Sequence, residues 1–198
     1  MKFSKTLIGL IVVIAGILAL GGCVSSKYNT LVNSEEVLNN SWADLQSAYQ
    51  RRADLIPNLV NTVKGYAKHE SETLQGVVNA RARATQMTID PSKSSPQQIA
   101  EFQQAQGELS QALGKLLAVT ENYPDLKANN NFSELQAQLE GTENRINESR
   151  KLYNAAVQSY NVQVRSFPMN IFANFFGFEK KQGFEATPQA QNAPTVNF

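Results

Sequence analysis

The stretch FSELQAQLEGTENRINESRKLYNAAVQSYNVQVRSF, residues 132–167, decides the fold. Its apolar side chains recur at steps of three, four or seven residues, at Phe132, Leu135, Leu139, Ile146, Tyr153, Tyr160, Val164 and Phe167. These steps place the side chains on one stripe of an α-helix. The pattern therefore predicts a long amphipathic helix with the apolar seam of a coiled coil.

Three earlier segments of the chain show the same spacing. Alternation of apolar and polar residues with a period of two, which would indicate strands, is absent. The sequence is therefore predicted to be all-α from residue 27 to residue 167. The apolar stripes of these segments are formed by Tyr28, Leu31, Leu38, Trp42, Leu45 and Tyr49; by Ile56, Leu59, Val63, Tyr66, Leu74 and Val77; and by Ile99, Phe102, Leu109, Leu113, Leu116 and Tyr123.

Turn-forming residues mark the breaks between the later segments. Residues 89–96 form a loop in which Pro96 begins the next helix, because a proline in the first turn loses no hydrogen bond. A second loop runs over residues 123–131. The helix after it has two candidate capping pairs, Ser133 with Gln136 and Asn131 with Glu134, and it ends at Phe167-Pro168.

The break near Pro57 has two interpretations. The heptad continues through Pro57, so one long kinked helix is one of them. A helix over residues 27–87 would be about 90 Å long at 1.5 Å per residue, too long for the other segments to cover. We therefore predict a turn near Arg52-Ala53 with Asp54 as the N-cap. The resulting fold is an antiparallel up-down-up-down four-helix bundle.

Composition excludes several classes of protein. A net charge of +1 argues against a nucleic-acid partner, which requires a basic surface. One cysteine excludes a disulfide framework, and one histidine excludes paired-histidine metal motifs. His69-Glu70 lacks the second histidine of a zinc protease motif. We expect no metal, no cofactor and no enzymatic activity.

The N-terminus carries an export and membrane signal. Lys2 and Lys5 precede an uncharged stretch, residues 6–22, which is followed by Cys23. Leu20-Gly21-Gly22-Cys23 resembles a bacterial lipobox, in which the cysteine is acylated and the chain is cut before it. Acylation of Cys23 after removal of residues 1–22 is the preferred interpretation.

An uncleaved membrane-spanning helix is the alternative, because residues 6–26 are uncharged and about 20 residues span a bilayer. A third interpretation is a buried core helix. In the first two interpretations the basic N-terminus favours the cytoplasm, so the bundle is expected on the periplasmic or extracytoplasmic side of the membrane.

Several long blocks resemble the LemA family. They are residues 50–60 (QRRADLIPNLV), 62–66 (TVKGY) with His69-Glu70, 116–128 (LLAVTENYPDLKA) and 139–146 (LEGTENRI). Residues 28–32, Trp42, Tyr153-Asn154, Tyr160-Asn161, Phe167-Pro168 and Gly177-Phe178 extend the resemblance over residues 28–185. It implies a bacterial membrane-associated helical bundle without an established activity. One magnetosome branch of the family is linked to membrane organisation. Cys23 departs from the plain N-terminal transmembrane helix of many members.

Arg51, Arg52 and Asp54 form one candidate interaction site. At a turn, Asp54 would cap a helix and the arginines would be solvated or paired with acidic neighbours. Alternatively, the two arginines would clamp a carboxylate or phosphate of a small anionic or cell-wall ligand.

Charged and polar residues also occur along the predicted helices. Glu140, Glu143 and Arg145 lie close together, and we interpret them as helix surface or as an ion pair between helices. Polar residues at seam positions would fix the register of the bundle. These are Glu35, Arg52, Glu70, Gln106, Thr120 and Thr142.

The C-terminal part divides in two. Residues 168–185 are rich in aromatic residues, including Phe172, Phe175 and Phe176. This flap either folds back over the end of the bundle or exposes an apolar patch to a partner or a membrane. Residues 186–198 carry no charge and are predicted to be a disordered tail. Together these features predict a non-enzymatic, membrane-anchored scaffold of the cell envelope with an unknown protein partner.

Overall fold

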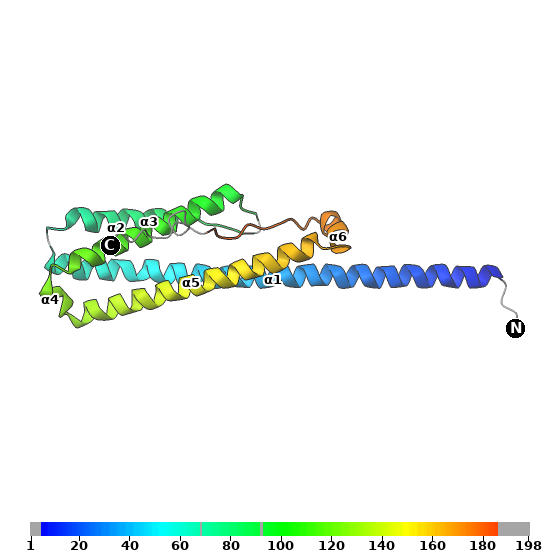
Figure 1. Cartoon of the computed structure of the whole chain (residues 1–198), viewed down its shortest axis with the longest axis horizontal. Coiled ribbons are helices and arrows are strands. Elements are labelled where there is room, and N and C mark those ends of the chain that lie inside the picture. Colours follow the sequence, from blue (N-terminus) through cyan, green and yellow to red (C-terminus); the bar gives the residue numbers. More distant parts are fainter. Residues whose placement is uncertain (1–4, 68, 92, 186–198) are drawn as a thin grey trace, which may run out of the picture. The chain divides into compact units, whose positions relative to one another are not determined.

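A computed structural model describes residues 5–67, 69–91 and 93–185 of the chain, and all regular secondary structure in them is α-helical (Figure 1). The predicted all-α class is confirmed. The predicted tail over residues 186–198 lies outside the described residues. The helices are α1 (Lys5–Tyr66), α2 (Ser71–Gln86), α3 (Pro96–Thr120), α4 (Pro124–Lys127), α5 (Asn130–Arg165) and α6 (Met169–Phe176).

The first break in the helical body lies later than predicted. The turn at Arg52-Ala53 and the N-cap role of Asp54 are wrong, because α1 continues through Pro57 and ends at Tyr66. Pro57 has no N–H to donate to the carbonyl of Ala53. The Nε of Arg81, on α2, donates to that carbonyl at 2.7 Å instead. A contact from a neighbouring helix therefore satisfies the group that the proline leaves without its helical donor.

The later helix ends follow from local chemistry. Pro96 begins α3 as predicted, and Ser95 and Gln98 form a capping box there. At the start of α5 the backbone N–H of Phe132 donates to Oδ1 of Asn129 at 3.1 Å. The two predicted capping pairs are wrong, since Asn131 and Ser133 both lie inside α5.

The chain divides into two compact units, and α1 and α5 each contribute to both. The first unit comprises Met1–Leu38 and Ala156–Lys181. Its buried apolar side chains come from α1, the end of α5 and α6, because these helices carry their apolar residues at helical spacing. They are Leu31, Leu38, Val157, Tyr160, Val164, Met169, Ala173 and Phe178.

The second unit comprises Asn39–Ala155 and Gln182–Phe198. A buried cluster in this unit draws on α1, α2, α3, α4 and α5, so the seam residues of the separate helices meet in one core. The cluster consists of Ile56, Leu59, Val63, Ala67, Leu74, Val77, Ala80, Ala84, Leu109, Leu113, Leu116, Leu126, Phe132 and Leu139.

The N-terminal part of α1 differs from the rest of the helix. Leu10, Val12, Ile14, Ile17 and Leu18 all expose large apolar side chains. From Gly9 onward, α1 has the length and apolar composition of a membrane-crossing helix, criteria that core helices and signal sequences also meet.

The contact between Arg81 and Ala53 can be tested with a double-mutant cycle. We expect Arg81→Met to lower the free energy of unfolding of the detergent-solubilised chain by about 1–2 kcal/mol, because the carbonyl of Ala53 loses its donor. In a Pro57→Ala background the restored N–H at position 57 replaces that donor. The cost of Arg81→Met, measured by urea unfolding, should then fall by at least about half. An equal cost in both backgrounds would show that Arg81 does not compensate for Pro57.

Candidate functional site

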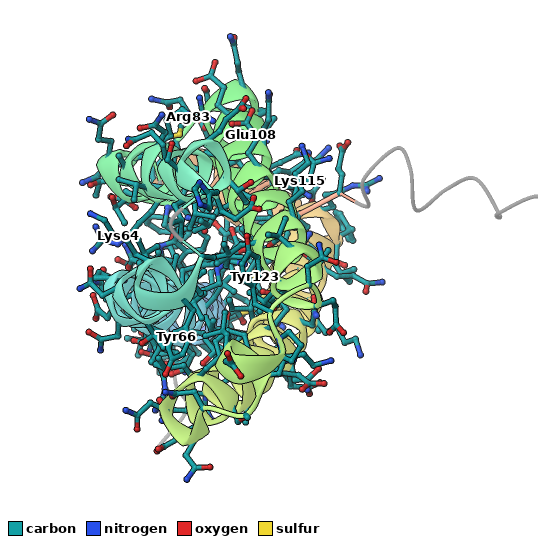
Figure 2. The ribbon with its side chains drawn as sticks, turned by 90° about the vertical axis from the view of Figure 1, so that its left-hand side faces the viewer. Lys64, Tyr66, Arg83, Glu108, Lys115 and Tyr123 are labelled. Atoms are coloured by element: carbon teal, nitrogen blue, oxygen red, sulfur yellow. The ribbon has the colours of Figure 1, made fainter. Side chains whose placement is uncertain are left out.

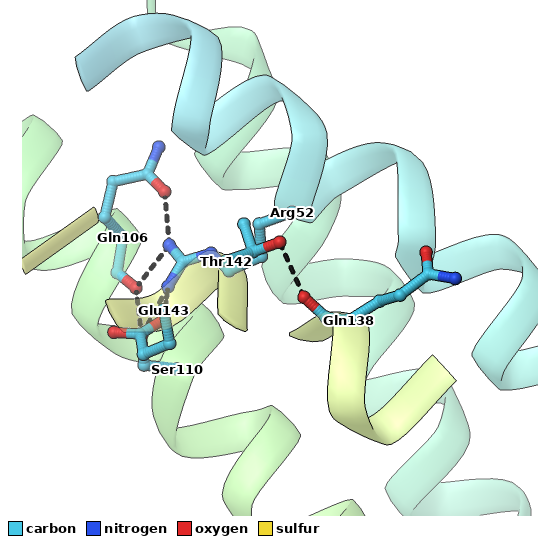
Figure 3. A network of polar contacts seen from close by, with 6 residues as sticks. All are labelled: Arg52, Gln106, Ser110, Gln138, Thr142 and Glu143. Carbon is cyan, nitrogen blue, oxygen red and sulfur yellow. Dashed lines mark hydrogen bonds and ion pairs between the residues drawn. The ribbon is translucent and has the colours of Figure 1, made fainter. Parts of the chain in front are cut away.

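Arg52 lies in the interior of the second unit, with only 2% of its side chain exposed (Figure 3). Its Nη1 donates to Oγ of Ser110 at 2.7 Å and to Oε2 of Glu143 at 2.8 Å. Its Nη2 donates to Oε1 of Gln106 at 2.7 Å. A buried guanidinium is strongly unfavourable without an anion and further acceptors, and here it has both.

The network around Arg52 joins four helices. Arg52 belongs to α1, Gln106 and Ser110 to α3, and Glu143 to α5. Gln106 also donates from Nε2 to the carbonyl of Ala84, on α2, at 3.1 Å. Because a shift of any one helix along its axis would separate these partners, the network fixes their register.

The structure buries four of the six polar seam residues that the sequence singled out: Arg52, Gln106, Thr120 and Thr142. Thr142 donates to the carbonyl of Gln138 at 2.7 Å, and Thr120 donates to that of Leu117 at 2.6 Å. The other two seam residues form polar contacts instead. Glu35 pairs with Nζ of Lys181 at 3.2 Å, and Glu70 accepts from the hydroxyl of Tyr123 at 3.1 Å. A further buried polar residue, Ser149, was not predicted.

The two-arginine clamp predicted at positions 51 and 52 is not formed in this structure. Neighbouring residues of a helix point in different directions, so Arg51 is exposed while Arg52 is buried. Asp54 is exposed and accepts from Nε2 of Gln50 at 2.8 Å. Arg51 and Asp54 line an open surface hollow, whereas the guanidinium of Arg52 is engaged inside the core. Glu143, in turn, forms the ion pair between helices that the sequence indicated.

A second cluster in this unit is aromatic and includes the C-terminal segment. Phe184 stacks on Trp42, with ring centroids 5.9 Å apart and planes inclined by 15°. Phe102 and Tyr153 also pack against Trp42, at 5.7 and 5.4 Å. The guanidinium carbon of Arg150 lies over the Phe184 ring, 5.4 Å from its centroid. Phe184 is therefore a buried anchor for the segment that follows α6.

Two Tyr-Asn pairs of α5, seven residues apart, hold the segment that follows α6. In the second unit, Asn154 accepts from the backbone N–H of Phe184 at 2.8 Å and donates to its carbonyl at 3.0 Å. In the first unit, Asn161 makes the same pair of bonds to Lys181, at 2.9 and 2.8 Å. Sequence analysis missed this role, although the repeat of Tyr-Asn at a spacing of seven was visible.

The tyrosine of each pair is buried and neutral. Burial raises the pKa of Tyr153 to about 12, and its hydroxyl donates to the carbonyl of Gln182 at 3.2 Å. Burial, with smaller effects from Glu35 and Glu179, also raises the pKa of Tyr160 well above its ordinary value. Neither phenol therefore ionises at physiological pH, and both act as packing residues.

The remaining predicted site residues lie in the first unit. Cys23 is an exposed thiol on α1. Phe172 is half-buried on α6, whereas Phe175 and Phe176 are exposed. Phe176 contacts the ring of Tyr28 edge-on, at 5.0 Å between centroids.

The surface of α2 and α3 carries ordinary charge pairs. Figure 2 shows Arg83 beside Glu108, with Nη2 of the arginine 3.0 Å from the carboxylate. Both side chains are solvent-exposed, so this pair contributes little to stability. Across the described parts of the chain, no three His, Cys, Asp or Glu side chains gather in a way that would hold a metal ion.

Substitution of Glu143 tests the ion pair between Arg52 and Glu143. We expect Glu143→Gln to lower the free energy of unfolding by about 1–2 kcal/mol, because Arg52 keeps only neutral acceptors. Glu143 is 43% exposed, which limits the cost. In an Arg52→Met background the same change should cost under about 0.5 kcal/mol. The matched control is Glu140→Gln, at an exposed position of the same helix. Equal losses from the two substitutions in urea unfolding would contradict the assignment.

Removing the Phe184 ring should expose the aromatic cluster. We expect Phe184→Ala to lower the free energy of unfolding by about 3 kcal/mol, because a stacked buried ring is lost. Trp42 is the only tryptophan of the chain, so its fluorescence reports directly on this site. Its emission should shift to longer wavelength in Phe184→Ala and stay unchanged in the control, Phe175→Ala. Unchanged emission in both variants would mean that Phe184 does not cover Trp42.

Comparison with known proteins places this architecture in a family. Magnetosome protein MamQ 2 of Paramagnetospirillum magneticum is 24% identical over 204 residues, covering 94% of this chain and 75% of that protein. Magnetosome protein MamQ of Magnetospirillum gryphiswaldense is 24% identical, with coverages of 86% and 68%. Protein LemA of Metamycoplasma hominis is 25% identical, with coverages of 74% and 64%.

The family-level comparison covers most of the helical body. The sequence profile of the LemA family matches residues 41–198, which include the Arg52 network and both Tyr-Asn pairs. This match confirms the resemblance found in the sequence blocks. The chain belongs to the LemA family.

Proposed function

We propose that this protein is a membrane-anchored, non-enzymatic scaffold of the bacterial cell envelope. Its helical body would be an up-down-up-down four-helix bundle that presents a rigid surface to protein partners. The observation that carries the proposal is the contrast within α1. Its N-terminal part exposes Leu, Ile and Val side chains, whereas Arg52 is buried among internal partners.

The exposed apolar part of α1 supports attachment to a bilayer. Residues 6–26 would rise about 31 Å as a helix, close to the thickness of the hydrocarbon core. Cys23 has an exposed thiol and follows small residues, which suits acylation after cleavage. Both modes of attachment leave the helical body outside the membrane, on the periplasmic or extracytoplasmic side if the basic N-terminus is cytoplasmic.

The interior supports a scaffold rather than a binding pocket for small anions. Both terminal nitrogens of the Arg52 guanidinium are bonded to Ser110, Gln106 and Glu143, and its unpaired Nε is buried, so no edge of the group is open to an external anion. These bonds, with the bond from Gln106 to the carbonyl of Ala84, fix the register of four helices and so make the outer surface rigid, which lowers the entropic cost of binding a partner. Two relatives carry the name magnetosome protein, and family resemblance implies membrane association for this chain as well.

The intact mass of the protein extracted from membranes tests the anchor. We expect a chain that lacks residues 1–22 and carries acyl groups on Cys23, and we expect Cys23→Ser to abolish both changes. An unprocessed mass in the membrane fraction would identify the spanning helix instead. Recovery of the native protein wholly in the water-soluble fraction would contradict the proposal.

Site-specific crosslinking tests the scaffold role. A photoreactive residue at the exposed position 51 should trap the same partner in independent membrane preparations. The exposed position 78, on α2, serves as the control and should not trap that partner. Capture of only abundant proteins at both positions would contradict a scaffold that uses this surface.

A further inference from the structure

Helix α6 has an apolar face on both sides. Met169 and Ala173 are buried in the first unit, four residues apart on the inner face. Ile171 and Phe175, also four residues apart, point outward and are 58% and 82% exposed. The outer face of a helix on a soluble protein is usually polar, so this face requires an apolar environment.

A third exposed apolar residue lies just before the helix. Phe167, two residues before the start of α6, is 81% exposed. Phe167, Ile171 and Phe175 together form what we call the outer stripe. Three large exposed apolar side chains within nine residues mark a binding surface more often than a chance exposure of single residues does.

Contacts with α1 fix the position of α6 along the anchor. Within the first unit, the ring of Tyr28 lies edge-on to Phe176 at 5.0 Å and to Phe178 at 5.8 Å. Tyr28 is two residues beyond the uncharged stretch, residues 6–26. It therefore lies about 3 Å past the end of a membrane-spanning segment of that length.

Anchoring through an acylated Cys23 would place α6 at the same level relative to the membrane. Tyr28 follows Cys23 by five residues, which is about 7.5 Å of helix from the acylated cysteine. Both modes of attachment therefore bring α6 to the level of the lipid headgroups. Phe and Ile side chains are favourable at the boundary between headgroups and acyl chains, where amphipathic helices lie in the plane of the membrane.

Electrostatic attraction to lipid headgroups does not account for a contact between α6 and the membrane. The residues around α6 carry both signs, since Lys180 follows Glu179 and the side chain of Lys181 pairs with Glu35. The contact with lipid would therefore depend on burial of the outer stripe and would respond little to salt.

We infer that α6 is an interfacial helix that inserts Phe167, Ile171 and Phe175 into the surface of the bilayer that holds α1. This inference rests on the proposed membrane anchoring and adds a second contact to it. The second contact would restrict the rotation of the first unit about the axis of α1 and hold it at a fixed height. A protein covering the outer stripe is the competing occupant.

Quenching by brominated lipids tests the insertion. The full-length chain, purified and reconstituted in vesicles of phosphatidylcholine brominated near the headgroup, would carry Trp42→Phe with either Phe175→Trp or Val37→Trp. Val37 is the matched control, because it is an exposed apolar residue of the same unit, 11 residues beyond Ser26 on α1. A second pair of variants carries Phe175→Trp or Val37→Trp and keeps Trp42, so that the aromatic cluster is not disturbed. For this pair, the measured quantity is the increase in quenching over the parent protein.

We expect quenching at position 175 to exceed that at position 37 by at least about twofold, and to persist at high salt. Because the vesicles contain no other protein, quenching requires contact with lipid. Equal quenching at the two positions in a protein that floats with the vesicles would overturn the inference, assign the stripe to a protein partner and leave the anchor intact. A protein that does not float would overturn both the inference and the anchor.

Discussion

A buried cation, Arg52, constrains the helical body of this protein. Arg52 places a guanidinium among apolar residues, where a charge is strongly unfavourable unless it is paired. Its partners lie on α3 and α5, and Gln106 extends the network to α2. Apolar packing alone tolerates small shifts between helices, whereas these bonds require one register. The apolar seam supplies the driving force for packing, and Arg52 selects one arrangement.

The sequence was sufficient to predict the helical class, the start of α3 at Pro96 and most of the buried polar positions, whereas the predicted loop over residues 123–131 contains the short helix α4 and the start of α5. The correct predictions follow from periodicity and from turn chemistry, which are local properties. The break at Pro57 was predicted wrongly because its outcome is not local. Proline removes a hydrogen bond from the helix, but Arg81, 24 residues later, supplies another donor to Ala53. The spacing of residues along the chain does not reveal such a partner.

The arrangement of the candidate site also could not be predicted from the spacing of residues along the chain. The adjacency of Arg51 and Arg52 in the sequence suggests one cationic corner, yet the helix places one side chain in solvent and the other in the core. The role of Asn154 and Asn161 became visible only with the extended segment that they bind. Membrane attachment, by contrast, was indicated by composition alone, because an uncharged apolar stretch of this length is unfavourable in water and long enough to span a bilayer. The segment that follows α6, by comparison, packs Phe184 against the aromatic cluster around Trp42.

The continuity of α1 through Pro57 is the claim on which the network depends, since a turn at this point would move Arg52 out of the core. Residue-resolved amide hydrogen exchange of the full chain in lipid nanodiscs tests it most directly. The account predicts slow exchange from residue 45 to residue 63, with residues 52–56 as protected as the middle of α3. Exchange at residues 52–56 as fast as in the loop between α2 and α3 would contradict it.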